Sequence, residues 1–155
     1  MDTHVFLSYA REDESRVDDI LNALTAKEFP VFIDRSMPSG VEWRQVLEAQ
    51  LQRAYAVVVA WSTHSVTSEW VAREADVGLA KDRLFPILLE RGVVPPERFA
   101  HLQAADLSGW SGDPDDPQFE RAILLLKELW GIQVGTLTPI TIQKPIRYRR
   151  PDDTR

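Results

Sequence analysis

The sequence predicts an α/β fold in which a five-stranded parallel sheet carries helices on both faces. Short apolar runs alternate along the chain with amphipathic segments, and the first four of these runs are apolar at nearly every position. Such alternation is typical of parallel strands joined by crossover helices, and continuous apolarity indicates strands that are buried on both faces. With 155 residues, the chain suits one domain with a hydrophobic core of its own.

The strands and helices are expected in the order βαβαβαβ(α)βα. The apolar runs that predict strands span residues 4–9, 30–34, 55–62, 84–90 and, with fewer apolar positions, 101–108. Apolar residues at helical spacing predict helices over residues 17–24, 47–54 and 119–130, the last one stopped by Gly131. After the fourth strand, Pro95 and Pro96 favour a loop with at most a short helix.

The predicted domain covers residues 1–131, and residues 132–155 form a predicted tail. This last stretch contains Pro139, Pro145 and Pro151 and has no helical periodicity, so we expect an extended or disordered segment. Its composition suits a linker to another module.

The charge balance disfavours nucleic acid and membrane surfaces as partners. Eighteen basic and 24 acidic side chains give a formal net charge of −6, and a negative field repels nucleic acid and anionic lipid. The basic run RYRR at 147–150 lies in the proline-containing tail, and we interpret it as a solvated terminal segment.

Several absences in the sequence narrow the function further. There is no cysteine, which excludes disulfides, thiolate zinc sites and cysteine nucleophiles. His4, His64 and His101 are far apart and lack ligand spacing, so no metal site is expected. The N-terminus lacks the features of a signal peptide and no apolar stretch is long enough to span a bilayer. We therefore predict a cytoplasmic protein.

Ligands of an open parallel sheet bind beyond the carboxyl ends of its strands. The turn after the first strand, SYARED, has no glycine, which excludes Rossmann and Walker phosphate loops, and its acids oppose a flavodoxin phosphate loop. The third strand ends in Trp61 and Ser62 rather than in the aspartate of a response-regulator receiver. No G-x-S-x-G nucleophile elbow occurs. The candidate segments are SYARED (8–13), DRSMPSGVEW (34–43), WSTHSVTSEW (61–70) and the loop after the fourth strand.

Glu74 differs from the other acids of the helix that follows the third strand. Glu69 and Asp76 each have Arg73 at the spacing of a helical ion pair. The positions one turn from Glu74 instead hold Trp70, Val71, Val77 and Gly78. The expected N-cap of this helix is Ser65, Thr67 or Ser68, and the expected buried stripe is Val71, Ala75 and Gly78 or Leu79.

A carboxylate beside an indole, with no basic residue one turn away, suits a site that stabilises a developing positive charge. Trp70, Glu74 and Val77 form the stripe next to the buried one, which places Glu74 at the edge of the core near the strand ends. The alternative is an ordinary ion pair between Glu74 and a distant residue such as Arg11. Spacing alone favours this alternative, because structural ion pairs also use carboxylates.

Three segments together resemble the boxes of a TIR domain (Toll/interleukin-1 receptor homology) of the bacterial kind. VFLSYARED (5–13) resembles the first box, FPVFIDRSMPSGVEW (29–43) the second box with its BB loop, and STHSVTSEWVAREADVGL (62–79) the opening of the third helix. The resemblance covers roughly residues 4–130, with the boxes in the family's order. It implies a flavodoxin-like TIR fold.

Many bacterial, plant and some animal TIR domains are NAD glycohydrolases, and their catalytic glutamate matches Glu74. The resemblance therefore implies NAD as substrate, no separate cofactor, and nicotinamide and ADP-ribose or cyclic ADP-ribose as products. Some members carry two basic residues after the first-strand tyrosine, where this chain has Ala10 and Arg11. The implied substrate-binding residues are Trp70, Trp43, Ser8, Tyr9, Arg11 and Asp34. For Trp43, which has helical spacing to Leu47 and Leu51, packing in the core is the alternative.

The BB loop of such enzymes takes part in assembly. The resemblance implies self-association into oligomers or filaments, activity that depends on this assembly, and a role in bacterial antiviral defence. The tail would then lead to a sensor domain in a longer parent protein. The alternative function is a non-enzymatic signalling module that binds other TIR domains through the same loop. The loop residues concerned are Arg35, Ser36, Met37, Pro38, Ser39 and Gly40.

Overall fold

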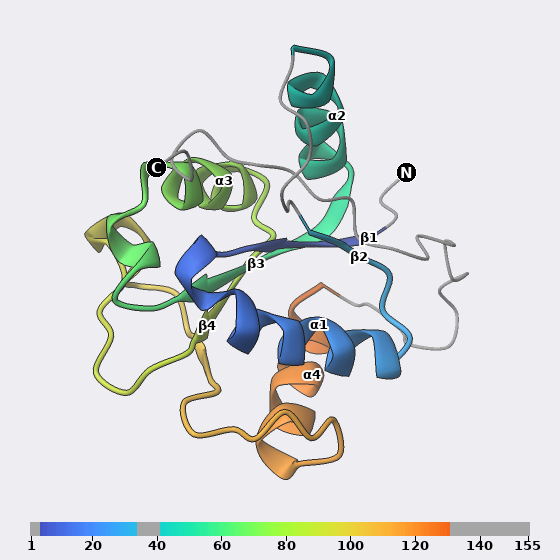
Figure 1. Ribbon diagram of the computed structural model, residues 1–155, viewed down its shortest axis with the longest axis vertical. Coiled ribbons are helices and arrows are strands. Elements are labelled where there is room, and N and C mark those ends of the chain that lie inside the picture. The colour runs from blue at the N-terminus through green and yellow to red at the C-terminus, as the bar shows by residue number, and fades with distance from the viewer. Residues whose placement is uncertain (1–3, 34–40, 131–155) are drawn as a thin grey trace.

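The computed structural model describes residues 4–33 and 41–130, with side chains described for 4–33 and 45–127. Five parallel strands form one sheet in the order β2-β1-β3-β4-β5 (Figure 1), which confirms the predicted fold class. The strands are β1 (His4–Ser8), β2 (Val31–Ile33), β3 (Ala54–Trp61), β4 (Leu84–Leu88) and β5 (Ala105–Asp106). The α-helices are α1 (Glu14–Ala26), α2 (Val41–Gln52), α3 (Glu69–Ala80) and α4 (Pro117–Trp130). Short 3-10 helices are η1 (Arg11–Asp13), η2 (Ser65–Thr67) and η3 (Glu97–Phe99).

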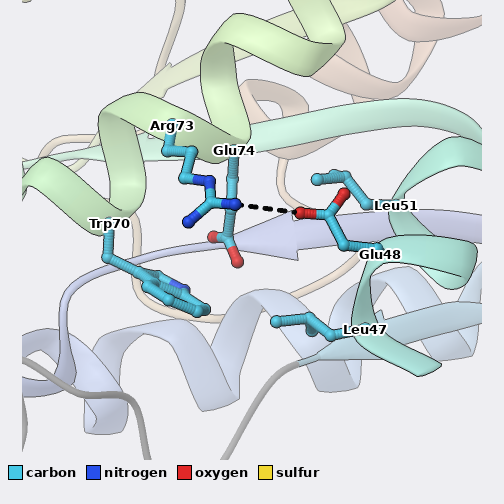
Figure 2. Close-up of a pocket in the computed structure, with 6 residues that line it drawn as sticks. All are labelled: Leu47, Glu48, Leu51, Trp70, Arg73 and Glu74. Carbon is cyan, nitrogen blue, oxygen red and sulfur yellow. Dashed lines mark hydrogen bonds and ion pairs between the residues drawn. The ribbon is translucent and has the colours of Figure 1, made fainter. Parts of the chain in front are cut away.

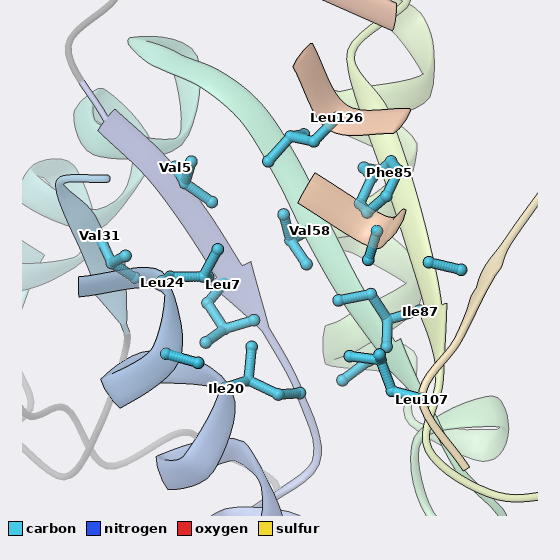
Figure 3. Packing of buried hydrophobic residues seen from close by; sticks show 14 of the residues in the cluster. Val5, Leu7, Ile20, Leu24, Val31, Val58, Phe85, Ile87, Leu107 and Leu126 are labelled. Carbon is cyan, nitrogen blue, oxygen red and sulfur yellow. The ribbon is translucent and has the colours of Figure 1, made fainter. Parts of the chain in front are cut away.

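The helices form a layer on each face of the sheet. α1 and α4 cover one face, and α2 and α3 cover the other (Figure 1). Successive residues of β1 therefore enter different cores: Val5 and Leu7 pack with α1 and α4, whereas Phe6 packs with α2 and α3. Figure 3 shows the first core, where Leu24 of α1 and Leu126 of α4 meet residues of the strands.

Two boundaries differ from the sequence prediction. The fifth strand, expected over 101–108, is only Ala105–Asp106. It ends because the Asp106 carboxylate accepts hydrogen bonds from the backbone N–H and the hydroxyl of Ser108, which turn the chain. Ala54, expected in a helix, is the first residue of β3, because it pairs with His4 in the sheet. None of the helices in the described ranges combines the length and apolarity needed to cross a membrane.

α3 lies close to β3 because residue 78 is a glycine. A β-carbon at this position would lie 2.8 Å from Cβ of Val57 and 3.3 Å from Cδ1 of Leu84. The first distance is too short for two carbon atoms in contact, so the present spacing requires a residue without a side chain. Glu74 lies one turn before Gly78, so the same close packing sets how deeply the Glu74 side chain enters the protein.

We expect Gly78→Ala to lower the free energy of unfolding by about 1–3 kcal/mol, because the added methyl group forces α3 away from β3. Helix propensity by itself would raise the free energy of unfolding of Gly78→Ala by about 1 kcal/mol, so a decrease indicates that the steric effect dominates. Urea denaturation measures the free energy of unfolding. Ala80→Gly, at an exposed position of the same helix, measures the propensity difference between alanine and glycine without the steric effect. A more stable Gly78→Ala variant would contradict the close packing.

Candidate active site

The strand order reverses between β1 and β3, and the candidate site lies at this reversal. β2 lies on one side of β1, and β3, β4 and β5 follow on the other. In open parallel sheets, ligands bind at such a reversal, beyond the carboxyl ends of the strands. Ser8 is the last residue of β1, and α3 follows β3 after the loop of residues 62–68.

Glu74 of α3 is a buried carboxylate at this position. Only 3% of its surface is exposed, and its Oε1 accepts a 2.6 Å hydrogen bond from the hydroxyl of Ser8. Ser68 caps α3, because its side chain accepts a 3.2 Å hydrogen bond from the backbone N–H of Val71. The structure therefore selects Ser68 among the predicted caps and buries Glu74 more deeply than the predicted place at the edge of the core.

A pocket between α2 and α3 opens onto Glu74 (Figure 2). The Trp70 ring and the Glu74 carboxylate point toward the same space as Leu47. The Arg73 guanidinium and the Glu48 carboxylate, 3.4 Å apart, form an ion pair between the two helices. The empty space, including the part open to solvent, is about 300 Å³. The lining residues are Leu47, Glu48, Leu51, Trp70, Arg73 and Glu74.

This arrangement suits a flat ligand that carries or develops positive charge. Leucine side chains and an indole ring can pack against an aromatic ring of the ligand. A carboxylate removed from water stabilises a neighbouring cation more strongly than it would in water. Within residues 4–33 and 41–130, no three potential metal ligands cluster together.

A second buried carboxylate, Asp13, holds the loop that leads to α3. Only 2% of its surface is exposed, and its Oδ2 accepts a hydrogen bond from the hydroxyl of Ser62. Its Oδ1 lies 2.5 Å from the Arg16 guanidinium. The Ser62 oxygen in turn accepts 3.1 Å hydrogen bonds from the backbone N–H groups of His64 and Ser65. The first turn of the loop is therefore tied to η1.

Glu90 joins the same loop to the end of β4. Its carboxylate accepts a 2.6 Å hydrogen bond from the backbone N–H of Thr63, which holds the pKa of Glu90 below its ordinary value. Arg16 lies 3.6 Å from this carboxylate and also pairs with Asp13, so one guanidinium links both acids. This network was not predicted from the sequence. The signal that could have indicated it is the acid-rich turn after the first strand, where Asp13 lies.

Three of the predicted site residues come together: Ser8, Trp70 and Glu74. Tyr9 does not, because its side chain is buried in the core with α1 and α4, on the other face of the sheet. Arg11 begins η1 and is exposed to solvent. Outside the described residues lie Asp34, Arg35, Ser36, Met37, Pro38, Ser39 and Gly40, as well as the side chain of Trp43.

The ion pairs of α3 differ from those predicted by helical spacing. Arg73 pairs with Glu48 of α2 rather than with Asp76. Asp76 is bound instead by Arg98 through two hydrogen bonds of 2.7 and 2.8 Å. A bidentate guanidinium–carboxylate contact is stronger than a single one, which explains why Asp76 prefers this partner.

Most of the chain matches a known family. A family model described as the TIR domain matches residues 5–124. This chain belongs to the TIR domain family. The matched range begins in β1 and ends in α4, so it includes residues of all five strands and both residues of the Ser8–Glu74 hydrogen bond. No curated protein matches the chain.

Two solved TIR domain structures have a similar fold. The TIR domain of the Toll-related receptor TRR-2 from Hydra magnipapillata is 21% identical, with a TM-score of 0.63, over 82% of this chain and 98% of its own. The TIR domains of the activated Roq1 resistosome, which directly recognises the pathogen effector XopQ, are 19% identical, with a TM-score of 0.54, over 81% and 98%. At these identities the likeness shows the fold alone.

We expect Ser8→Ala to lower the free energy of unfolding by about 1–3 kcal/mol, because it removes a hydrogen bond from a buried carboxylate. Urea denaturation measures the change. Ser15→Ala, an exposed serine of α1, is the matched control and should change stability by less than about 0.5 kcal/mol. Equal effects of the two substitutions would contradict a stabilising contact between Ser8 and Glu74.

Proposed function

We propose that this TIR domain is an NAD glycohydrolase that cleaves the bond between nicotinamide and ribose. The observation that carries the proposal is the carboxylate of Glu74, a residue with only 3% of its surface exposed, which accepts a 2.6 Å hydrogen bond from Ser8 and points into the same pocket as the Trp70 ring. The products would be nicotinamide and ADP-ribose, or cyclic ADP-ribose. NAD is the substrate in this proposal, and no separate cofactor takes part.

A single carboxylate suffices for this reaction. Ordinary glycosidases use two, one of which protonates the leaving oxygen. The nicotinamide of NAD is already cationic, so the C1′–N bond breaks with both electrons going to nitrogen, and nicotinamide leaves neutral. The remaining ribosyl cation is stabilised by the charge of Glu74 until a water oxygen, or an atom of the adenine in a cyclisation, bonds to C1′. In hydrolysis, the attacking water releases one proton to the solvent.

Ser8 and Trp70 would position the reacting groups. The hydroxyl of Ser8 donates to one carboxylate oxygen of Glu74 and so orients that carboxylate. Trp70 offers its ring for stacking on the cationic nicotinamide. Arg11, Asp34 and Trp43 remain proposed contacts of the rest of the substrate. The structure supports no such role for Tyr9, which packs on the other face of the sheet.

We also propose that activity depends on assembly through the BB loop, residues 35–40. Family membership supports this, and the Roq1 structure contains TIR domains within a resistosome. Residues 132–155 would link this domain to a sensor in a longer parent protein, and the system would act in the cytoplasm in bacterial antiviral defence. NAD depletion or a cyclic product would be its signal.

We expect Glu74→Gln to lower nicotinamide release at least about 100-fold, because it removes the charge that stabilises the ribosyl cation. Glutamine keeps the size of the side chain and an oxygen that accepts from Ser8, so the fold should persist. The assay incubates concentrated protein with NAD and quantifies nicotinamide by chromatography. Glu69→Gln, an exposed acid in the first turn of the same helix, is the control.

Equal turnover by wild type and Glu74→Gln would remove Glu74 from the reaction. No turnover by either protein, even after the domain is forced into filaments, would favour the non-enzymatic interaction module.

We expect Trp70→Ala to lower kcat/KM for NAD about tenfold, through loss of stacking on nicotinamide, and Trp70→Phe to keep most of the activity. Circular dichroism and thermal denaturation monitor folding. Trp110→Phe is the matched control, because Trp110 is also partly buried but stacks on Phe119 at 4.8 Å, in the other core. If Trp70→Ala unfolds the domain, Trp70 is a core residue instead.

A further inference from the structure

Arg73 and Glu48 form an exposed ion pair at the pocket that contains Glu74 (Figure 2). The guanidinium of Arg73 on α3 lies 3.4 Å from the carboxylate of Glu48 on α2, and these side chains are 65% and 44% exposed. Water and salt screen such a pair, so it contributes little to stability. Arg73 can therefore exchange Glu48 for another anion at small cost.

Arg98, which binds another residue of α3, is held more firmly than Arg73. Arg98 holds Asp76 of α3 through two short hydrogen bonds, and these raise the pKa of Arg98. Its guanidinium also lies 4.6 Å from the centre of the Phe99 ring. Arg98 is thus fixed by several contacts, whereas the described contact of Arg73 is one long hydrogen bond.

The charges at the pocket match the two ends of a nicotinamide nucleotide. Among the six lining residues, Arg73 carries the positive charge, and Glu48 and Glu74 carry negative charge. In NAD, the diphosphate is attached to C5′ of the same ribose whose C1′ bears nicotinamide. The first phosphate is therefore about one sugar ring from C1′, and Arg73, the residue before Glu74 on α3, lines the same pocket as Glu74.

The turn after β1 strengthens this assignment. Ala10 is buried and offers no charge, and Arg11 is exposed on η1. Neither residue lines the pocket, whereas Arg73 does. A guanidinium also suits this task, because its fork of N–H groups binds two phosphate oxygens at once.

We propose that Arg73 binds the diphosphate of NAD and that Glu48 holds the guanidinium until substrate replaces it. This inference rests on the proposed function and adds a specificity-determining residue to it. The Glu48 carboxylate competes with the diphosphate for the Arg73 guanidinium and repels the diphosphate, which raises the NAD concentration needed for binding. The affinity for ligands without phosphate does not depend on this competition.

Two ligands test the inference by direct binding. NAD carries the diphosphate, and nicotinamide riboside keeps the nicotinamide and the ribose without phosphate. Dissociation constants are measured by NMR titration of labelled protein, with Glu74→Gln as background so that NAD persists. We expect Arg73→Gln to weaken NAD binding about tenfold and to change nicotinamide riboside binding less than about twofold. Glu48→Gln should tighten NAD binding about two- to fivefold.

Arg98→Gln and Asp76→Asn are the matched controls, because they remove the same charges from an ion pair of α3 away from the pocket. Both should leave the affinity for either ligand unchanged. Equal weakening of both ligands by Arg73→Gln, or no effect on either, would overturn the inference.

Nicotinamide release by the wild-type protein decides the proposed function separately. If the wild-type protein releases nicotinamide but Arg73→Gln does not change the affinity for NAD, the proposed function stands and the inference about Arg73 is refuted. Binding of NAD that depends on Arg73, without any release, supports the diphosphate site and refutes the hydrolase. Failure of NAD to bind any variant, together with no nicotinamide release by the wild-type protein, overturns both.

Discussion

The hydrogen bond from Ser8 to Glu74 joins the last residue of β1 to the middle of α3 inside the protein. Burial removes a carboxylate from water at a cost in free energy, and hydrogen bonds or opposite charges must offset that cost. The close packing of α3 on β3, which Gly78 permits, brings Glu74 to this depth. The position of the charge beside the strand reversal, and with it the pocket, depends on this contact.

Polar contacts away from the pocket hold both of its walls. Asp13 and its partners fix the loop before α3. At the end of α2, His4 donates a 2.8 Å hydrogen bond to the carbonyl of Gln50, and Lys81 donates to the carbonyl of Gln52. These bonds satisfy carbonyl groups that a helix end leaves open, and burial lowers the pKa of His4, which favours its neutral ring. The two walls of the pocket are thus held by polar contacts of residues that do not line it.

The resemblance to the TIR boxes, added to strand-end position and helical spacing, predicted Ser8, Trp70 and Glu74 as site residues, and the structure brings these three side chains together. Tyr9 shows where local information ends. Adjacent strand residues point to opposite faces, and β1 is apolar on both, so no alternation in its sequence indicates which neighbour faces the pocket. The short β5 was overestimated for a similar reason: an apolar run does not reveal the side-chain turn at Asp106 that ends the strand.

The sequence by itself determined the order of strands and helices, the fold class, the family and the place of Glu74 on its helix, because periodicity and motif spacing act over short distances. Only the tertiary structure decided the partners of the charges. Arg73 pairs with Glu48 and Asp76 pairs with Arg98, each on a different element from its partner. Exposed ion pairs differ so little in energy that helical spacing cannot choose among them, and the packing of distant elements makes the choice.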